Sequence, residues 1–177
     1  MKERSAIKFF NSLGVQIVEI SLSDPAIKAY NKGIGLFKQG NTEKAIASFK
    51  EAIRMEPNYI DAHYNLAASY YFLEQMEDAR KEYEKVLELR PQDVDALNNL
   101  GAITFLDGQL EQAKQLFDKA FKFDSEFALT HRNFAVYYQR KGNATKSAEH
   151  VKKAKEFDEK IFDQESRPPR IPAEINF

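Results

Sequence analysis

Four asparagines recur along the chain at one fixed spacing, and their carboxamides are the first side chains whose chemistry stands out. Successive members of this column lie 34 residues apart: Asn31, Asn65, Asn99 and Asn133. A carboxamide offers an acceptor oxygen and a donor NH2 group, so it can hold the N–H and the C=O of one peptide unit together. A regular column of carboxamides therefore predicts binding of an extended polypeptide along its backbone. The alternative interpretation is that each asparagine bonds only to a neighbouring helix as a packing feature.

The other side chains that could do chemistry do not assemble into a catalytic pattern. His63 and His131 stand 68 residues apart at the same phase of the chain, which indicates a packing role, and His150 stands alone. No nucleophile, base and orienting group come together, and no phosphate-binding loop is present. We therefore expect no enzymatic activity, no metal ligands and no cofactor.

The composition of the 177 residues fits a soluble globular chain, with 43% hydrophobic and 30% charged residues. The net charge of -1 gives no bulk attraction to nucleic acid. The absence of cysteine suits a reducing compartment and removes thiolate chemistry. No long uncharged apolar run and no secretory signal are recognisable, so we expect a cytoplasmic location. Peripheral attachment to a membrane or organelle surface is the alternative.

Self-comparison at an offset of 34 residues divides most of the chain into four repeats. Their ranges are 26–59, 60–93, 94–127 and 128–161. Small residues form one column, Ala45, Ala79, Ala113 and Ser147, and a second column holds Gly33, Ala67, Gly101 and Ala135. Mostly aromatic residues form a third column, namely Phe49, Tyr83, Phe117 and Val151. Because helices approach closely only where side chains are small, these columns predict packed helices.

Each repeat splits into two helical patterns separated by a break, which contains glycine in three of the four repeats. The predicted helices are 26–39, 43–56, 60–73, 77–90, 94–107, 111–124, 128–141 and 145–162. No single helix pair can bury both of its apolar faces, so the repeats must stack.

The pattern over residues 26–161 resembles the tetratricopeptide repeat family in its period and in its glycine, alanine, aromatic and proline columns. The resemblance implies an all-α, right-handed superhelical solenoid of antiparallel helix pairs that acts as a protein–protein interaction module. Some family members hold a terminal carboxylate with a Lys and Asn pair in the first repeat. Here those two places are Tyr30 and Ile34, so a clamp of that type is not expected.

In this family the stacked first helices line the inner, concave wall, and the four asparagines lie on that stripe at position six of each repeat. The same stripe carries aromatic candidate anchors, namely Tyr30, Tyr64, Phe37, Tyr71 and Phe105. Its thirteenth position carries Lys38, Phe72, Leu106 and Arg140. Arg132 and Arg140 make the C-terminal end basic, which suits an acidic patch or carboxylate on an apolar partner segment. The alternatives are that the aromatics belong to the core and that the arginines are solvated charges.

The two ends of the chain lie outside the repeats. Residues 1–25 show an apolar face at helical spacing, which predicts a capping helix or helix pair. The competing interpretations are a strand in VQIVEIS, self-association through this face, and a weak membrane-surface anchor. Residues 162–177 contain prolines and predict an extended tail, which could also dock into a groove of its own chain or of a neighbour.

These patterns predict a non-catalytic adaptor that binds extended or short helical peptide segments in its groove. The alternative is a self-assembling scaffold on an organelle or membrane surface. The order of an N-terminal apolar segment and then these repeats is faintly similar to bacterial magnetosome-associated scaffold proteins. We expect a protein or peptide partner, self-association through the N-terminal segment as an alternative, and no nucleic acid.

Overall fold

The chain divides into two compact units, residues 1–66 and 67–177, and each is described by itself. In the computed structural model the described residues are 7–11, 14–18 and 25–159, and of the first two ranges only the backbone is described.

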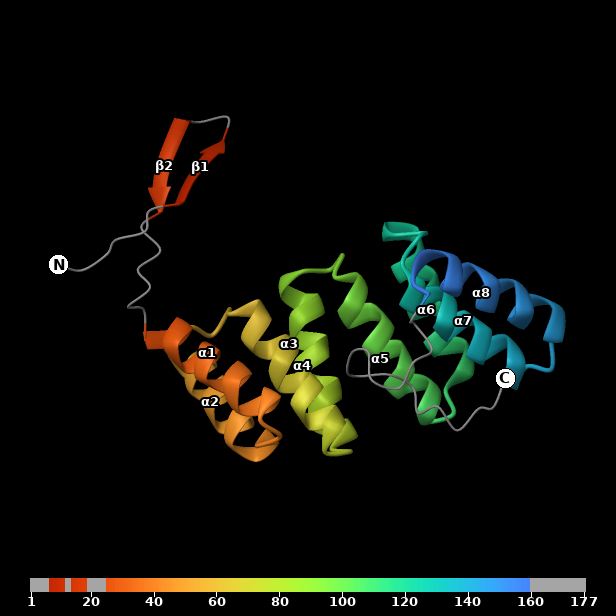
Figure 1. Ribbon diagram of the computed structural model, residues 1–177, viewed down its shortest axis with the longest axis horizontal. Coiled ribbons are helices and arrows are strands. Elements are labelled where there is room, and N and C mark those ends of the chain that lie inside the picture. The colour runs from red at the N-terminus through yellow and green to blue at the C-terminus, as the bar shows by residue number, and fades with distance from the viewer. Residues whose placement is uncertain (1–6, 12–13, 19–24, 160–177) are drawn as a thin grey trace. The chain divides into compact units, whose positions relative to one another are not determined.

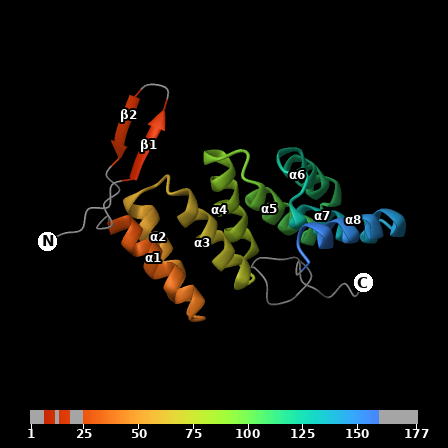
Figure 2. The ribbon, with the colours of Figure 1, turned by 45° about the horizontal axis from the view of Figure 1, so that its top comes forward.

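The first unit contains a hairpin of two strands, a helix pair and the start of a third helix (Figure 1). β1 (Ile7–Asn11) pairs antiparallel with β2 (Gly14–Val18), and the register joins Ile7 to Val18 and Asn11 to Gly14. α1 (Pro25–Lys38) packs against α2 (Thr42–Met55), and the two helices lie side by side in both views (Figure 2).

The capping helix predicted for residues 1–25 is wrong over the described part of that range, because the structure has strands there. A helix over this range would include Asn11 and Gly14, and neither is a good helix former. β-branched residues at Ile7, Val15, Ile17 and Val18 favour strands instead. The strand interpretation of VQIVEIS therefore holds over Val15–Val18. Residues 1–6 and 19–24 lie outside the described part of the chain.

α3 (Ile60–Phe72) crosses the boundary between the units, and five further helices follow within the second unit. These are α4 (Met76–Leu89), α5 (Val94–Leu106), α6 (Leu110–Phe123), α7 (Ala128–Arg140) and α8 (Ala144–Phe157). α5 packs against α6, and α7 packs against α8. The repeat region is therefore all-α, and every predicted helix is present.

The predicted boundaries agree within a residue except at the last helix, which was expected to reach residue 162. α8 ends at Phe157, and Asp158 adopts an extended conformation. Glu56 and Asp124 end their helices with the same extended conformation. The end of α8 therefore repeats the ends of α2 and α6. The tail predicted for residues 162–177 lies outside the described residues.

The small columns have the predicted packing role. A Cβ on Gly33 would stand 2.5 Å from Phe49 Cε1, and one on Gly101 would stand 2.5 Å from Phe117 Cε1. Ala45, Ala79 and Ala113 have no exposed surface. Ser147, the polar member of that column, donates its hydroxyl to the carbonyl of Ala135 at 3.0 Å.

The breaks inside the repeats also follow the sequence. Gly40, Gly108 and Gly142 adopt positive φ angles of 77°, 80° and 73°. The break without glycine places Glu74 at φ 58°, so a non-glycine residue adopts the left-handed conformation there.

In the second unit, the second helix of one repeat is tied to the first helix of the next by polar contacts. Arg80 on α4 binds Asp107, which directly follows α5, and donates to Thr104 on α5 at 3.4 Å. Tyr137 on α7 donates to Glu111 on α6 at 3.2 Å. These contacts join α4 to α5 and α6 to α7 within the second unit.

Candidate functional site

The first unit contains two asparagines of the column. One side-chain amide is exposed, and the other already makes hydrogen bonds within the protein. Asn31 on α1 is exposed. Asn65 on α3 is half-buried, and its amide nitrogen donates to the carbonyl of Asp61 at 2.8 Å and to the hydroxyl of Tyr30 at 3.1 Å. Burial and the nearby charge of Asp61 raise the pKa of Tyr30, so its hydroxyl stays neutral and available to Asn65.

In the second unit, Asn133 of the column and Asn98, at position five of the preceding repeat, form a buried network between α5 and α7. Asn98 donates to the carbonyl of Val94 at 2.9 Å and to the hydroxyl of Thr130 at 2.8 Å. Asn133 donates to Asn98 Oδ1 at 3.0 Å. Asn98 is 0% and Asn133 is 1% exposed, so these bonds are made away from solvent. Asn133 Oδ1 accepts no hydrogen bond from the described residues and is itself buried.

The two units share one pattern of hydrogen bonds that the sequence analysis did not predict. The asparagine at position six of one repeat donates to the side chain at position five of the preceding repeat, Asn65 to Tyr30 and Asn133 to Asn98. The expectation that the whole amide is available to a partner is therefore wrong for the nitrogens of these two residues. Stacking of the repeats already uses these donors, and of the two residues it is Asn133 whose Oδ1 accepts no hydrogen bond from the described residues. The signal was present as a 35-residue spacing between a polar position five and the next asparagine.

The remaining polar candidates are buried to different degrees. Asn99 is 2% and Arg132 is 5% exposed, whereas Arg140 at the end of α7 is exposed. Burial raises the pKa of Tyr71 to about 12, and the positive charge of Arg132 opposes that shift. Tyr71 and Arg132, both predicted site residues, therefore belong to the same unit and interact electrostatically.

The predicted aromatic anchors are less accessible than the sequence suggested. Tyr71 and Phe105 at position twelve are each 8% exposed, while Tyr30, Tyr64 and Phe37 are half-buried. Their neighbours at position thirteen, Phe72 and Leu106, are 60% and 43% exposed. These two side chains were noted on the stripe but not chosen as contact residues. A shift of one residue turns a helical side chain by about 100°, and the pattern alone did not reveal which of two adjacent apolar positions is buried.

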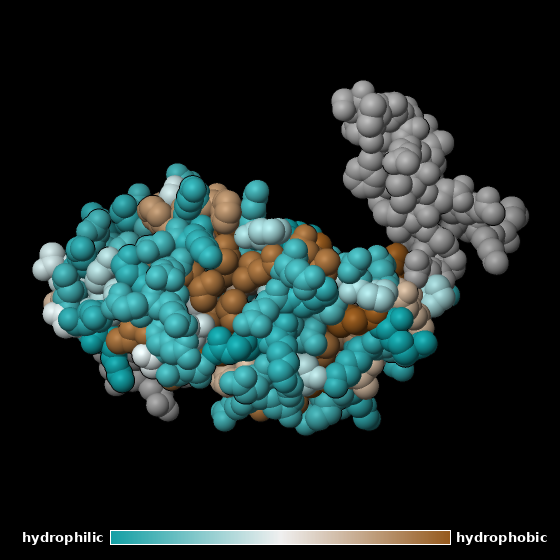
Figure 3. Space-filling view, turned by 180° about the vertical axis from the view of Figure 1, so that it is seen from behind, coloured by the Kyte–Doolittle hydropathy of each residue, from teal (hydrophilic) through white to brown (hydrophobic). Residues whose placement is uncertain are grey.

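Apolar side chains also reach the surface elsewhere in the described part of the chain. Figure 3 shows a face that is mostly hydrophilic, with apolar side chains gathered among the polar ones. Phe121, Phe123 and Phe157 are 37%, 45% and 38% exposed and lie near the C-terminal ends of second helices. These three phenylalanines therefore lie outside the stripe formed by the first helices.

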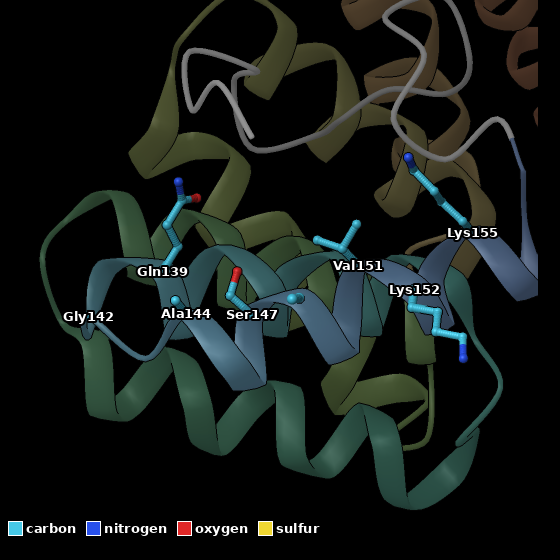
Figure 4. A pocket seen from close by; sticks show the side chains of 8 residues that line it. Gln139, Gly142, Ala144, Ser147, Val151, Lys152 and Lys155 are labelled. Atoms are coloured by element: carbon cyan, nitrogen blue, oxygen red, sulfur yellow. The ribbon is translucent and has the colours of Figure 1, made fainter.

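A groove at the C-terminal helix pair was not predicted from the sequence. It has a volume of about 660 Å³ and is lined mainly by one face of α8, with Gln139 contributed by α7. Figure 4 shows Gln139, Ser147 and Val151 pointing to one side, with Lys155 on that side too, while Lys152 points the other way. Val151 is half-buried, although its counterparts Phe49, Tyr83 and Phe117 have no exposed surface. Gln139 Oε1 is buried and accepts no hydrogen bond from the described residues.

The histidines have the packing role expected of them. The Nε2 atoms of His63 and His131 lie 3.0 Å and 2.9 Å from the carbonyls of Pro57 and Ser125, in the loops before their helices. A carbonyl only accepts, so Nε2 of His131 carries the proton and its neutral Nδ1 is an acceptor. His150 Nδ1, at 2.9 Å, must then donate to it.

No group of three or more potential metal-binding side chains occurs among the described residues. Within the same part of the chain, no helix is both long and apolar enough to cross a membrane. The features available for binding are helix pairs with buried carboxamides and exposed apolar side chains.

Comparison with known families identifies the class. Residues 36–103 and 94–123 each match a family model described as tetratricopeptide repeat. The chain is therefore a tetratricopeptide repeat protein, as the sequence pattern predicted.

Individual relatives narrow the comparison. An uncharacterized protein of Methanocaldococcus jannaschii, MJ0572, is 38% identical over 52 residues, which cover 29% of this chain and 60% of that protein. The chain spans less than two thirds of the length of the curated relatives that it matches. The structure of MamA from Desulfovibrio magneticus RS-1 is 26% identical with a TM-score of 0.68, covering 80% of each chain. This likeness supports the predicted similarity to magnetosome-associated scaffold proteins.

A further structural neighbour has been solved with a peptide. The first TPR of Spaghetti (RPAP3), bound to the HSP90 peptide SRMEEVD, is 22% identical with a TM-score of 0.64. The alignment covers 68% of this chain and 95% of that chain. The repeat family and these neighbours make the chain a protein-interaction module.

Proposed function

We propose that the module binds an extended partner segment along the first helices of the second unit, using acceptor oxygens and exposed apolar anchors. The observation that carries the proposal is Asn133 Oδ1, which is buried and accepts no hydrogen bond from the described residues. Leaving a buried acceptor unsatisfied costs about 1–3 kcal/mol, and a backbone N–H of a bound segment would remove that cost. Asn31, which is exposed, offers an accessible carboxamide in the first unit.

Hydrogen bonds alone would not hold a partner. Each contributes about 1 kcal/mol, whereas micromolar affinity needs about 8 kcal/mol. Phe72 and Leu106 supply the apolar surface, since fully burying such a side chain contributes about 1.5–3 kcal/mol. The partner segment therefore carries apolar side chains that cover these two anchors.

The basic residues of α7 indicate the charge of the partner segment. Arg140 is exposed and Arg132 lies on the same helix, so the C-terminal part of the stripe favours an acidic side chain. Tyr30 and Ile34 replace the Lys and Asn pair that some relatives use for a terminal carboxylate. An internal segment with acidic residues thus fits better than a carboxyl-terminal tail.

Two phenylalanines give a matched test. Peptides selected from a displayed library against the full chain are titrated by fluorescence anisotropy. We expect Phe72→Ser to weaken binding at least tenfold, because it removes an anchor. Phe123→Ser is the control, since Phe123 is similarly apolar and 45% exposed but lies on a second helix. Equal affinities for the wild-type chain and Phe72→Ser, at unchanged stability, would contradict the proposal.

A second candidate function is self-assembly into a scaffold, which the likeness to MamA favours. It would place the protein on an organelle or membrane surface by peripheral attachment, whereas the adaptor would act in the cytoplasm. Light scattering after size-exclusion, before and after deletion of residues 1–22, tests it. A full-length chain that stays monomeric at high concentration would remove this candidate. Neither function uses catalysis, and we propose that the protein has none.

A further inference from the structure

Two buried acceptor oxygens on α7 receive no hydrogen bond from the described residues. Asn133 Oδ1 and Gln139 Oε1 are both buried and accept no hydrogen bond from residues 25–159. They are acceptors only, so whatever completes them must bring N–H or O–H donors. An extended backbone carries such groups at every residue except proline.

The groove beside Gln139 has the shape and lining for such a backbone. It follows α8 from Ala144 to Lys155, a rise of about 16 Å along a helix, and its floor includes Val151 and Ala148. Lys155 lies at the end next to the last described residues, and Gln139 lies at the other (Figure 4). Val151 is only half-buried here, so the floor is apolar surface with nothing stacked on it from the described repeats.

The sequence that follows α8 begins at the mouth of this groove. The described chain ends at Glu159, four residues after Lys155, and eighteen residues follow, 160–177. In a polyproline-type conformation they would reach about 56 Å, more than three times the length of the groove. A segment tethered this closely acts at millimolar effective concentration.

The chemistry of this segment matches the surface. Pro168 and Pro169 fall at positions seven and eight of a would-be fifth repeat, inside its first helix, where proline is unfavourable. The segment carries a backbone N–H at every residue except its prolines, together with apolar Ile171 and Ile175 and acidic Glu174. These suit the acceptors, the apolar floor, and the cations Lys155 and Arg140.

We propose that residues 160–177 lie in cis along the α8 groove and the adjoining stripe of α7, where they compete with a partner segment. The proposal rests on the proposed function, because it takes the same surface to be a binding site for extended backbone. The tail is then the resident occupant of that surface, and a partner must displace it.

The absence of cysteine makes a direct test available in the full chain. Ala173→Cys carries a nitroxide label, and paramagnetic broadening is recorded on 15N resonances. We expect the amide signals of Gln139 to Lys155 to lose more than half of their intensity. The control is the same labelled chain with Ile171→Asp and Ile175→Asp, in which the intensity returns. No broadening in the labelled chain would overturn the proposal. Equal broadening in a mixture of labelled 14N and unlabelled 15N chains would assign the contact to a second copy and also overturn it.

A second measurement reports on competition. A fluorescent peptide of residues 160–177 is titrated against the wild-type chain and against Ile171→Asp/Ile175→Asp. We expect at least tenfold tighter binding to the variant, because its own tail no longer occupies the groove, and equal affinities would overturn the proposal. If the label detects no contact in cis while library peptides still depend on Phe72, the tail proposal fails and the proposed function stands. If no peptide binds any of the chains, the proposed function fails with it.

Discussion

At the scale of the residue, polar side chains in this protein are used twice. Asn133 donates inward to Asn98 and leaves its oxygen as an acceptor, and His131 joins a loop carbonyl on one side to His150 on the other. For Asn133 the donor holds the stack together and the oxygen remains as an acceptor, whereas both ring nitrogens of His131 are used within the fold. Substituting such a residue therefore tests stability and binding at once, which is why Phe72 gives the cleaner variant.

The histidine pair predicts a pH dependence of stability. Burial and then the charge of His131 lower the pKa of His150 to about 4, from an ordinary value of 6.5. Burial also lowers the pKa of His131. The unfolded chain therefore binds these protons before the folded chain does, so stability is full above pH 6.5 and falls as the pH drops toward 4.

We expect the free energy of unfolding in urea to fall by about 1 kcal/mol between pH 7 and pH 5, after allowing for the partial exposure of His150. Glu149 opposes the shift and Lys153 and Lys146 reinforce it, so moderate salt should reduce the change. His150→Gln lacks the titrating group and should show a flatter profile. A profile as steep as that of the wild-type chain would show that His150 is not responsible.

At the scale of the element, the helices could be predicted because the same apolar periodicity recurs in all four repeats. Glycine and alanine columns located the helix contacts, and the structure confirmed them at Gly33 and Gly101. Of the N-terminal strands, β2 was only the alternative interpretation and β1 was not predicted, because residues 1–25 have no second copy against which to check the phase. The α8 groove was not predicted because the pattern of apolar positions does not show that Val151 is only half-buried. The exposure of Phe72 over Tyr71 depends on helix rotation, which a pattern of apolar positions does not specify.

A pair of glycines tests whether close helix contact controls stability. Gly101→Ala places a Cβ 2.5 Å from Phe117, so we expect a loss of about 1–3 kcal/mol from overpacking. Gly35→Ala is the matched control on another first helix, where no atom lies within 4 Å. It should gain about 0.5–1 kcal/mol, because alanine restricts the unfolded chain and favours the helix. Urea unfolding of both variants decides the matter, and two losses of equal size would count against the packing argument.

At the scale of the whole molecule, the chain is an array of repeats, and the asparagine side chains join consecutive repeats. The bonds from Asn65 to Tyr30 and from Asn133 to Asn98 each span 35 residues, one repeat and one position. A solenoid built in this way presents one face many times over, which suits recognition of a repetitive feature of the ligand. The backbone of an extended polypeptide is such a feature, because its N–H groups recur whatever the side chains are.

The account therefore makes backbone N–H groups of the partner its central recognition element. The most direct test is to methylate the backbone nitrogens of a selected peptide one at a time and measure each affinity for the wild-type chain and for Asn133→Ala. We predict that at least one internal methylation weakens binding to the wild-type chain about tenfold, equivalent to about 1.4 kcal/mol, and has little effect on Asn133→Ala. Affinities that stay within twofold at every methylated position would contradict the account.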